Sequence, residues 1–493
     1  MQNTAPFVDV LIIGAGISGI GCAFHLQKHC PDLSYSIIEA RSDLGGTWDL
    51  FKYPGIRSDS DLFTFGYDFK PWKEKKAIAD GDAIKAYIDE TAKESGIYNN
   101  IRFLQRVIDI DWQSDKQHWV VTLKSEEGKG TEQVCARWIF NASGYYRYDK
   151  GYTPEFAGQS AFSGRIVHPQ HWPKNLDYAG KRVVVIGSGA TAVTLVPSMA
   201  GKAAHVTMLQ RTPSYVLPVP TQDPVAKRLR PWLGDTVAFN AARRFNIAKQ
   251  RWVYAFCQRF PNRARKIIRN LNAKMLPDDY PVDVHFNPPY NPWEQRLCAV
   301  PGGDLFKAIS NGSASVVTNI IKHFTETGIQ LTTGEHIEAD IIVTATGLNL
   351  LPLGGIKPKL DGKEVSLPQC VTYKGMLLSG VPNFAIAVGY TSSSWTLKIG
   401  LLCEHFTRLL NYAKEHDYTQ CVPVADPNME TQPLLNFGAG YIQRSIELLP
   451  RQGKKFPWSM SWNYAEDVKI FRKGRLDDPA LRFSSSTSAG VMK

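Results

Sequence analysis

The sequence predicts an α/β protein built from two similar strand–turn–helix units and a helical insert. Three observations support this fold class. Apolar runs lead into Gly-rich turns at Val8–Gly19 and again at Arg182–Ala192, and a helix-like stretch follows each turn. Between residues 223 and 285 the chain becomes basic, aromatic and helical in pattern. With 493 residues, it has room for several domains of roughly 100 to 200 residues.

The composition is that of an ordinary globular protein, with 43% hydrophobic and 21% charged residues. The net charge of +11 suggests an anionic ligand or surface. The eight cysteines are scattered without a C-x-x-C pair, so we expect free, mostly buried thiols, a cytoplasmic location and no metal site. No secretory signal and no run of about 18 apolar residues is present, so no transmembrane helix is expected.

The first turn carries Gly14, Gly16 and Gly19 in G-x-G-x-x-G spacing directly after a strand. Such glycines allow the backbone, here with Ser18, to approach a pyrophosphate at a helix N-terminus. A second strand, Tyr35–Ile38, ends in Glu39, whose carboxylate can accept the ribose hydroxyls of an adenosine. The pattern predicts a dinucleotide site; the alternative is a glycine turn without a ligand.

The second turn has Ala192 in the third glycine position, which the motif allows. Its second strand, Val206–Leu209, is followed by Gln210, Arg211 and Thr212 and not by an acid. A guanidinium can hold a 2′-phosphate by charge-assisted bonds, so this site is expected to prefer NADPH. The alternative is that Arg211 is a solvated surface residue. The residues expected to contact this cofactor are Gly187, Ser188, Gly189, Ala190, Thr191, Arg211 and Thr212.

Two such sites in one chain indicate two Rossmann-like dinucleotide-binding domains, one for a bound FAD and one for NADPH. Disulfide reductases share this layout but need a redox-active cysteine pair, which the spacings here do not supply. Reduced flavin must therefore pass its electrons elsewhere, and dioxygen is the obvious acceptor.

A further motif lies just before the second turn. Phe162, Gly164, His168, Trp172 and Pro173 fit the pattern F-x-G-x-x-x-H-x-x-x-W-P. In this respect the chain resembles the Baeyer–Villiger type of class B flavoprotein monooxygenases. Gly45–Trp48, Tyr53–Asp59 and Ala345–Gly347 also occur in that family's order. Within the family the chain is most similar to the ethionamide-activating and long-chain alkane monooxygenase branch.

The resemblance implies that NADPH reduces FAD, that oxygen forms a C4a-peroxyflavin, and that this species converts a ketone to an ester or lactone, with sulfoxidation as a side activity. It implies that Arg296 is the fixed cation beside the reacting oxygen and that Asp59 orients it. Gln295 stands where the family typically has a lysine, which would weaken the preference for NADPH. His168 is expected to act in a hinge more than in the chemistry. Further cofactor contacts are implied at Gly46, Thr47, Trp48, Asp59, Thr346 and Gly347.

Other functions stay open. The same flavin chemistry could oxygenate sulfur or nitrogen, or serve alkane oxidation in the cell. A different class would be a non-oxygenating NADPH oxidase or a redox-dependent surface-binding protein. The expected substrates are O2 and an apolar ketone or sulfide.

The expected domains are 1–150 and 341–493 for FAD, 151–222 and 286–340 for NADP, and 223–285 for the insert. Lys227–Lys274 holds thirteen Lys and Arg against one acid, Asp235, with aromatic residues between them. The insert could be a solvated segment whose aromatics pack against a nucleotide domain. It could instead lie on the anionic inner face of a membrane. Nucleic acid is not expected, because no recognition module accompanies the charge.

Overall fold

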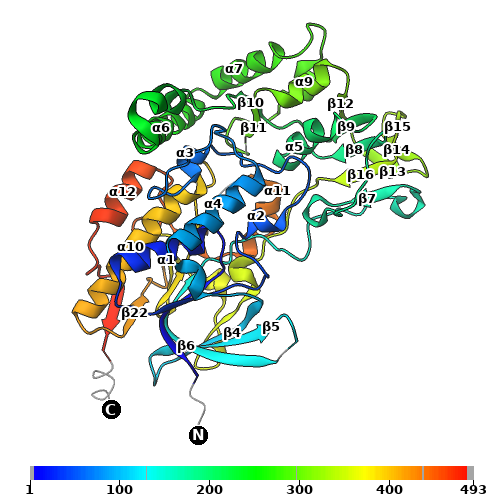
Figure 1. Ribbon diagram of the computed structural model, residues 1–493. Coiled ribbons are helices and arrows are strands. Elements are labelled where there is room, and N and C mark those ends of the chain that lie inside the picture. Colours follow the sequence, from blue (N-terminus) through cyan, green and yellow to red (C-terminus); the bar gives the residue numbers. More distant parts are fainter. Residues whose placement is uncertain (1–4, 129, 296, 436–437, 486–493) are drawn as a thin grey trace.

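Two separate β-sheets, one behind each Gly-rich turn, form the two halves of the molecule, and long helices cover one end (Figure 1). The computed structural model describes residues 5–128, 130–295, 297–435 and 438–485. The first sheet has eleven strands and the second has five. This arrangement confirms the predicted α/β class.

The first sheet runs in the order β18-β17-β4-β5-β6-β1-β2-β3, with β21, β20 and β19 continuing from β6. Its Gly-rich turn follows β1, which pairs in parallel with β2 and β6. Val10, Leu11 and Ile12 are fully buried, because both faces of the sheet are covered. The strands are β1 (Phe7–Ile13), β2 (Tyr35–Ile38), β3 (Ile101–Arg102), β4 (Gln105–Gln113), β5 (His118–Ser125), β6 (Thr131–Asn141), β17 (Pro358–Leu360), β18 (Lys363–Glu364), β19 (Thr372–Tyr373), β20 (Leu377–Leu378) and β21 (Phe384–Ile386).

Helices from both ends of the chain complete this half. α1 (Ile17–His29) packs against α10 (Trp395–Glu415), which in turn packs against α12 (Tyr464–Lys473). The N-terminal and C-terminal segments therefore share one hydrophobic core. The other helices of this half are α2 (Thr47–Leu50), α3 (Leu62–Phe65), α4 (Gly81–Glu94) and α11 (Gly440–Gln443). Two antiparallel strand pairs also belong to it: β22 (Gln420–Pro423) with β25 (Leu481–Ser484), and β23 (Thr431–Pro433) with β24 (Arg451–Gly453).

The second sheet is parallel, in the order β12-β9-β8-β16-β7. Its strands are β7 (Arg165–Val167), β8 (Arg182–Ile186), β9 (His205–Gln210), β12 (Ala314–Thr318) and β16 (Ile341–Thr344). Helices α5 (Ala190–Met199) and α9 (Asp304–Ser310) belong to one hydrophobic core, and the small sheet of β13 (Ile321–Phe324), β14 (Gly328–Leu331) and β15 (His336–Glu338) belongs to another. Because β16 lies inside this sheet, the second half extends past residue 340, where the sequence placed its end, to Thr344.

The insert forms α6 (Pro224–Arg259), α7 (Pro261–Ala273) and α8 (Val282–His285), which confirms its helical prediction. Asp223 caps α6 by accepting a hydrogen bond from the Ala226 N–H at 2.8 Å. Gly234, with φ +73°, interrupts α6. Parallel strands β10 (Val216–Val219) and β11 (Cys298–Pro301) lie at the two ends of the insert.

The eight cysteines are free, as expected, and seven of them are buried. Within the described ranges no helix is both long enough and apolar enough to cross a membrane.

Candidate active site

Both Gly-rich turns open onto one cavity of about 940 Å³ between the two halves of the molecule. The first half contributes Gly14, Gly16 and Glu39 to its wall, and the second contributes Gly189 and Thr191. Other predicted residues on the wall are Gly46, Thr47, Trp48, Asp59, Ala190, Gln295 and Gly347. The fold therefore brings the two predicted dinucleotide sites into the same space.

The three glycines of the first turn have different roles. Gly14 has φ +102°, and a Cβ there would lie 2.7 Å from the Ala142 carbonyl oxygen. A Cβ on Gly19 would lie 2.0 Å from the Gly14 carbonyl oxygen. Gly16 is different, because a Cβ there would meet only the Gly46 Cα, at 3.7 Å. Gly14 and Gly19 thus allow tight backbone packing, and Gly16 leaves room for a ligand on the cavity side.

Glu39 follows β2 and is 7% exposed. Its carboxylate accepts hydrogen bonds from the Ala15 N–H at 2.8 Å and the Arg41 N–H at 2.9 Å. Burial raises the pKa of this carboxyl, and the two N–H groups oppose the rise. The acid is thereby fixed against the first turn, where it can still face an adenosine ribose. Ser18 is buried; its hydroxyl accepts a hydrogen bond from Trp395 Nε1 at 2.9 Å and does not line the cavity.

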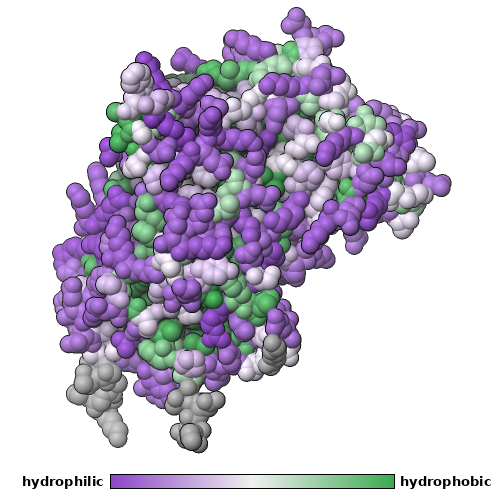
Figure 2. All heavy atoms as spheres, viewed as in Figure 1, coloured by the Kyte–Doolittle hydropathy of each residue, from purple (hydrophilic) through white to green (hydrophobic). Residues whose placement is uncertain are grey.

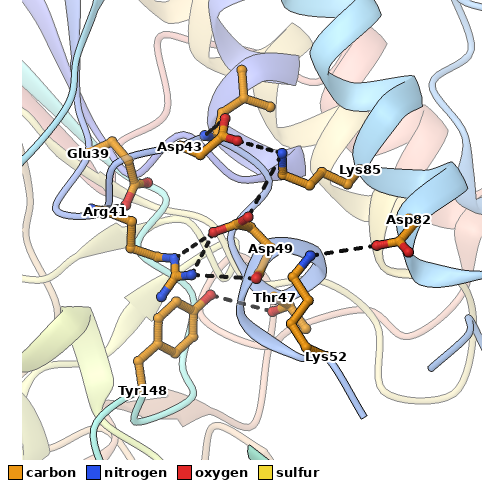
Figure 3. A network of polar contacts seen from close by, with 10 residues as sticks. Glu39, Arg41, Asp43, Thr47, Asp49, Lys52, Asp82, Lys85 and Tyr148 are labelled. Carbon is orange, nitrogen blue, oxygen red and sulfur yellow. Dashed lines mark hydrogen bonds and ion pairs between the residues drawn. The ribbon is translucent and has the colours of Figure 1, made fainter. Parts of the chain in front are cut away.

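A network of polar side chains holds the loop after Glu39 (Figure 3). Arg41 binds Asp49 through two nitrogens, at 3.0 and 2.6 Å, and Lys85 of α4 binds Asp43 at 2.6 Å. Close to them, the Thr47 hydroxyl lies 3.5 Å from the Tyr148 hydroxyl. The network links the end of β2 to α2 and α4, so it fixes Glu39 and Thr47 relative to each other. Sequence reasoning missed it, because no motif marks these residues.

The second turn repeats the geometry of the first. Gly187 has φ +137°, and a Cβ there would lie 2.4 Å from the Ala345 carbonyl oxygen. A Cβ on Gly189 would meet no atom within 4 Å, and Gly189 is the N-cap of α5. Ser188 donates a hydrogen bond to the Thr212 carbonyl oxygen at 2.9 Å, which ties the turn to the end of β9. Arg211 is exposed beside Thr212 and does not line the cavity.

The segment 53–61 forms the wall between the two turns. Tyr53 lies against Thr191 and shares a hydrogen bond with it, and burial raises the pKa of its hydroxyl to about 12. Arg57 forms an ion pair with Asp304 at the start of α9. These contacts fix the segment that places Asp59 on the cavity wall. Gln295 also lines the cavity, and Arg296 lies outside the described residues.

The fingerprint residues lie in and beside the linker between the halves. The His168 ring accepts a hydrogen bond from the Gln170 N–H at Nδ1, so Nε2 carries the hydrogen and donates it to the Gly347 carbonyl oxygen; both distances are 3.2 Å. Burial lowers the pKa of this histidine, which favours its neutral form. His168 does not line the cavity, so its geometry favours the hinge role over direct chemistry. Thr346 donates a hydrogen bond to the Tyr152 carbonyl oxygen at 2.6 Å, which holds the neighbouring backbone.

The other fingerprint residues serve packing. A Cβ on Gly164 would lie 2.4 Å from the Asp340 carbonyl oxygen, so only glycine fits there. Phe162 is buried in a core with Phe324. Trp172 packs against the core of the second half, and Pro173 accepts a hydrogen bond from the Leu176 N–H at 3.2 Å.

Trp395, whose region the sequence already suggested as pocket wall, and three tyrosines that sequence reasoning did not single out complete the cavity. Tyr145, Tyr146, Tyr148 and Trp395 line it, and the Tyr145 and Trp395 rings lie 5.2 Å apart. They come from segments more than 200 residues apart, so no local pattern could reveal that they meet.

The residues present fit two dinucleotide cofactors. Gly16 and Gly189 each leave an open space that a Cβ would fill, and Glu39 lies beside the space at Gly16.

Two dinucleotide turns on one cavity are typical of an oxidoreductase that uses two dinucleotide cofactors. Residues 8–353 match the model of the flavin-binding monooxygenase-like family. The chain is 50% identical over 479 residues to the "FAD-containing monooxygenase EthA" of Mycobacterium tuberculosis (strain H37Rv), covering 97% of this chain and 98% of that protein. It is 45% identical over 480 residues to the "Probable FAD-binding monooxygenase AlmA" of an Acinetobacter species, covering 97% and 96%.

The chain therefore belongs to the flavin-binding monooxygenase-like family. Its fold matches that of cyclohexanone monooxygenase from Rhodococcus sp. Phi1 bound to NADP+, with a TM-score of 0.74 and 20% identity over 98% of this chain and 100% of that one. The predicted class, a flavin-dependent monooxygenase with two dinucleotide-binding domains, is confirmed at the level of family and fold.

Proposed function

We propose that this monooxygenase inserts one oxygen atom of O2 into an apolar ketone, giving an ester or lactone. The balanced reaction consumes ketone, O2, NADPH and a proton, and releases the ester, NADP+ and water. The observation that supports it is the single cavity shared by the two turns, because a nicotinamide and a flavin must meet in one space to exchange a hydride.

The residues divide between the two cofactors. Gly16 would face the pyrophosphate of FAD, and Glu39 its adenosine ribose. Gly189 and the N-terminus of α5 would hold the pyrophosphate of NADPH, and Arg211 its 2′-phosphate. Bound FAD supplies the redox chemistry, taking a hydride from NADPH and passing two electrons to oxygen.

Arg296 is proposed as the cation at the reacting oxygen. A guanidinium keeps its charge at every working pH, so it can stabilise negative charge that develops when the carbonyl is attacked. Asp59 stands on the cavity wall and is proposed as the carboxylate that orients it. His168 is proposed as a positioning residue that holds the linker to the Gly347 segment, since Nδ1 accepts from Gln170 within the linker and Nε2 donates to the Gly347 carbonyl oxygen.

The substrate class follows from the cavity wall. Trp48, Phe65, Leu351 and Trp395 contribute apolar surface beside the polar turns. An apolar ketone or thioether suits such a wall. We propose a cytoplasmic enzyme that meets such substrates at a membrane surface.

The test is turnover of the FAD-loaded protein with NADPH and a long-chain or aromatic ketone. The proposal expects ester in step with NADPH consumed. Hydrogen peroxide alone, whatever the ketone, would indicate an NADPH oxidase instead. A thioether that gives sulfoxide while every ketone fails would indicate a sulfur oxygenase.

Arg296→Ala separates the two half-reactions. The variant should still allow NADPH to reduce the flavin, because the nicotinamide site is intact, and it should make no ester. Ester formation at the normal rate would contradict the role assigned to Arg296.

A further inference from the structure

The outer surface of α6 and α7 is both apolar and basic. Trp232 is 86% exposed and Trp252 is 67% exposed, far more than tryptophan side chains in a packed insert. Phe245, Ile267 and Leu271 are also exposed. Figure 2 shows green hydrophobic atoms among purple ones at this end of the molecule. The aromatics of the insert are thus not all packed against a nucleotide domain.

After the break at Gly234, exposed side chains form a stripe along α6, and α7 carries a second set beyond the break at Phe260. Within this part of α6, the exposed residues follow one another at steps of one, three, four and seven, which keeps them on one side of the helix. They are Val237, Arg244, Phe245, Ala248, Arg251, Trp252, Ala255 and Arg259. α7, which begins anew after Phe260, exposes Arg263, Lys266, Ile267 and Leu271 at similar spacing. We call this surface the α6–α7 face.

The charge of the α6–α7 face is one-sided. Asp235 is the one acid between residues 224 and 273, and it pairs with Arg230 at 2.9 Å. Around the stripe nine basic side chains are exposed and form no ion pair with a described residue. They are Lys227, Arg228, Arg244, Lys249, Arg251, Arg259, Arg263, Lys266 and Lys274.

We propose that the α6–α7 face docks on an anionic phospholipid bilayer. Exposed tryptophans suit the headgroup level of a bilayer, and basic side chains beside them suit anionic lipid. Arg263 and Arg259 lie 5.3 and 5.8 Å from the Phe260 ring centroid, so charge and apolar surface are interleaved and not segregated. A second copy of this chain would bring like charges together, which disfavours self-association.

The opposite side of α6 reaches the active site. Asn246 and Gln250 donate hydrogen bonds to the partly buried Asp61 carboxylate, at 3.1 and 3.0 Å. Ser393, on the cavity wall, donates one to Gln250 at 2.8 Å. One helix therefore presents the docking face outward and supports the cavity inward. The benefit of docking rests on the proposed function, since apolar ketones dissolve in the bilayer and an enzyme bound there finds them at higher concentration.

The first experiment is co-sedimentation of the FAD-loaded protein with vesicles of phosphatidylcholine alone or with phosphatidylglycerol. Binding should require the anionic lipid and weaken as NaCl rises from low to high concentration. Arg251→Gln with Lys266→Gln should weaken binding by about 25-fold, at about fivefold for each charge. Lys322→Gln with Lys363→Gln, two exposed lysines elsewhere, is the matched control and should change nothing.

A second pair of variants tests the apolar part. Trp252→Ser should weaken vesicle binding by about tenfold or more, because the indole no longer enters the interface. Ile320→Ser, a 54% exposed apolar residue outside the α6–α7 face, should not. Equal binding to both vesicle types, or none, would overturn the proposal. The proposal would also fail if single-stranded RNA bound the protein more tightly than the anionic vesicles do and displaced it from them. It would fail likewise if sedimentation analysis showed a dimer that Trp252→Ser abolishes.

Turnover separates this proposal from the proposed function. Trp252→Ser should oxidise a short, water-soluble ketone at the normal rate and lose rate only with a long-chain ketone presented in anionic vesicles. If no ketone is oxidised by any variant, vesicle binding still decides the docking proposal alone.

Discussion

Replacing Glu39 by Gln tests how the first dinucleotide site is built. In the native protein the carboxylate accepts two backbone N–H bonds, at 2.8 Å from Ala15 and 2.9 Å from Arg41, in a site where the residue is 7% exposed. A glutamine keeps one acceptor oxygen and turns an amide NH2 toward the other N–H. One buried donor then loses its partner, which costs about 1–3 kcal/mol of stability.

The affinity for FAD should fall as well, since the ribose would lose its bond to a charged acceptor. Hydrogen bonds to charged groups contribute about 1.5–3 kcal/mol, so the Kd for FAD should rise about 10- to 150-fold. Flavin fluorescence titration of the cofactor-free protein measures the Kd, and thermal unfolding without FAD measures the stability. Glu335→Gln, an exposed glutamate in the second half, is the control. An unchanged Kd in Glu39→Gln would refute the assignment of Glu39 to the ribose.

Three further predictions concern the second half and the pH dependence of stability. Arg211→Gln should raise the KM for NADPH by about 10-fold or more and leave the KM for NADH unchanged, because only NADPH carries the 2′-phosphate; equal changes would refute the assignment. Gly187→Ala should lower the Tm and weaken NADPH binding, because its Cβ would lie 2.4 Å from a carbonyl oxygen. Gly189→Ala should weaken NADPH binding and leave the Tm unchanged, because its Cβ would meet no atom within 4 Å. A lower Tm in Gly189→Ala would contradict the open space assigned to Gly189. Burial lowers the pKa of Lys374 to about 8 from 10.5, so the unfolded chain binds more protons between these values and stability rises with pH across that window. Lys374→Met should remove this rise in urea unfolding followed from pH 8 to 10, and Lys322→Met, at an exposed site, should not; a rise that persists in Lys374→Met would assign it to another group.

The parts of the site that depend on local residue spacing could be predicted from the sequence. The two glycine turns, Glu39 at the end of β2 and the insert helices were predictable, because each follows from neighbouring residues. The different roles of Gly187 and Gly189 were not, because they depend on whether Ala345 or open space faces the turn.

Contacts between distant segments lay beyond sequence reasoning. Trp395 meets Ser18 across 377 residues. Lys398 and Asp467 form an ion pair at 2.6 Å with both side chains 1% exposed, and the Tyr390 hydroxyl also donates to Asp467 beside the cavity. Neither the local composition nor the spacing of apolar residues distinguishes these buried charged residues from the solvated charged residues near them in the sequence. The exposure of Trp232 and Trp252 was likewise decided only by which face of α6 the core of the first half covers.

Isotope labelling tests the reaction most directly. The FAD-loaded protein is supplied with NADPH, an apolar ketone and ¹⁸O2 in ordinary water, and the product is analysed by mass spectrometry. The proposed function predicts an ester that carries one ¹⁸O atom, formed in step with the NADPH oxidised. Unlabelled product, or NADPH oxidised with all of the ¹⁸O recovered in hydrogen peroxide, would contradict it.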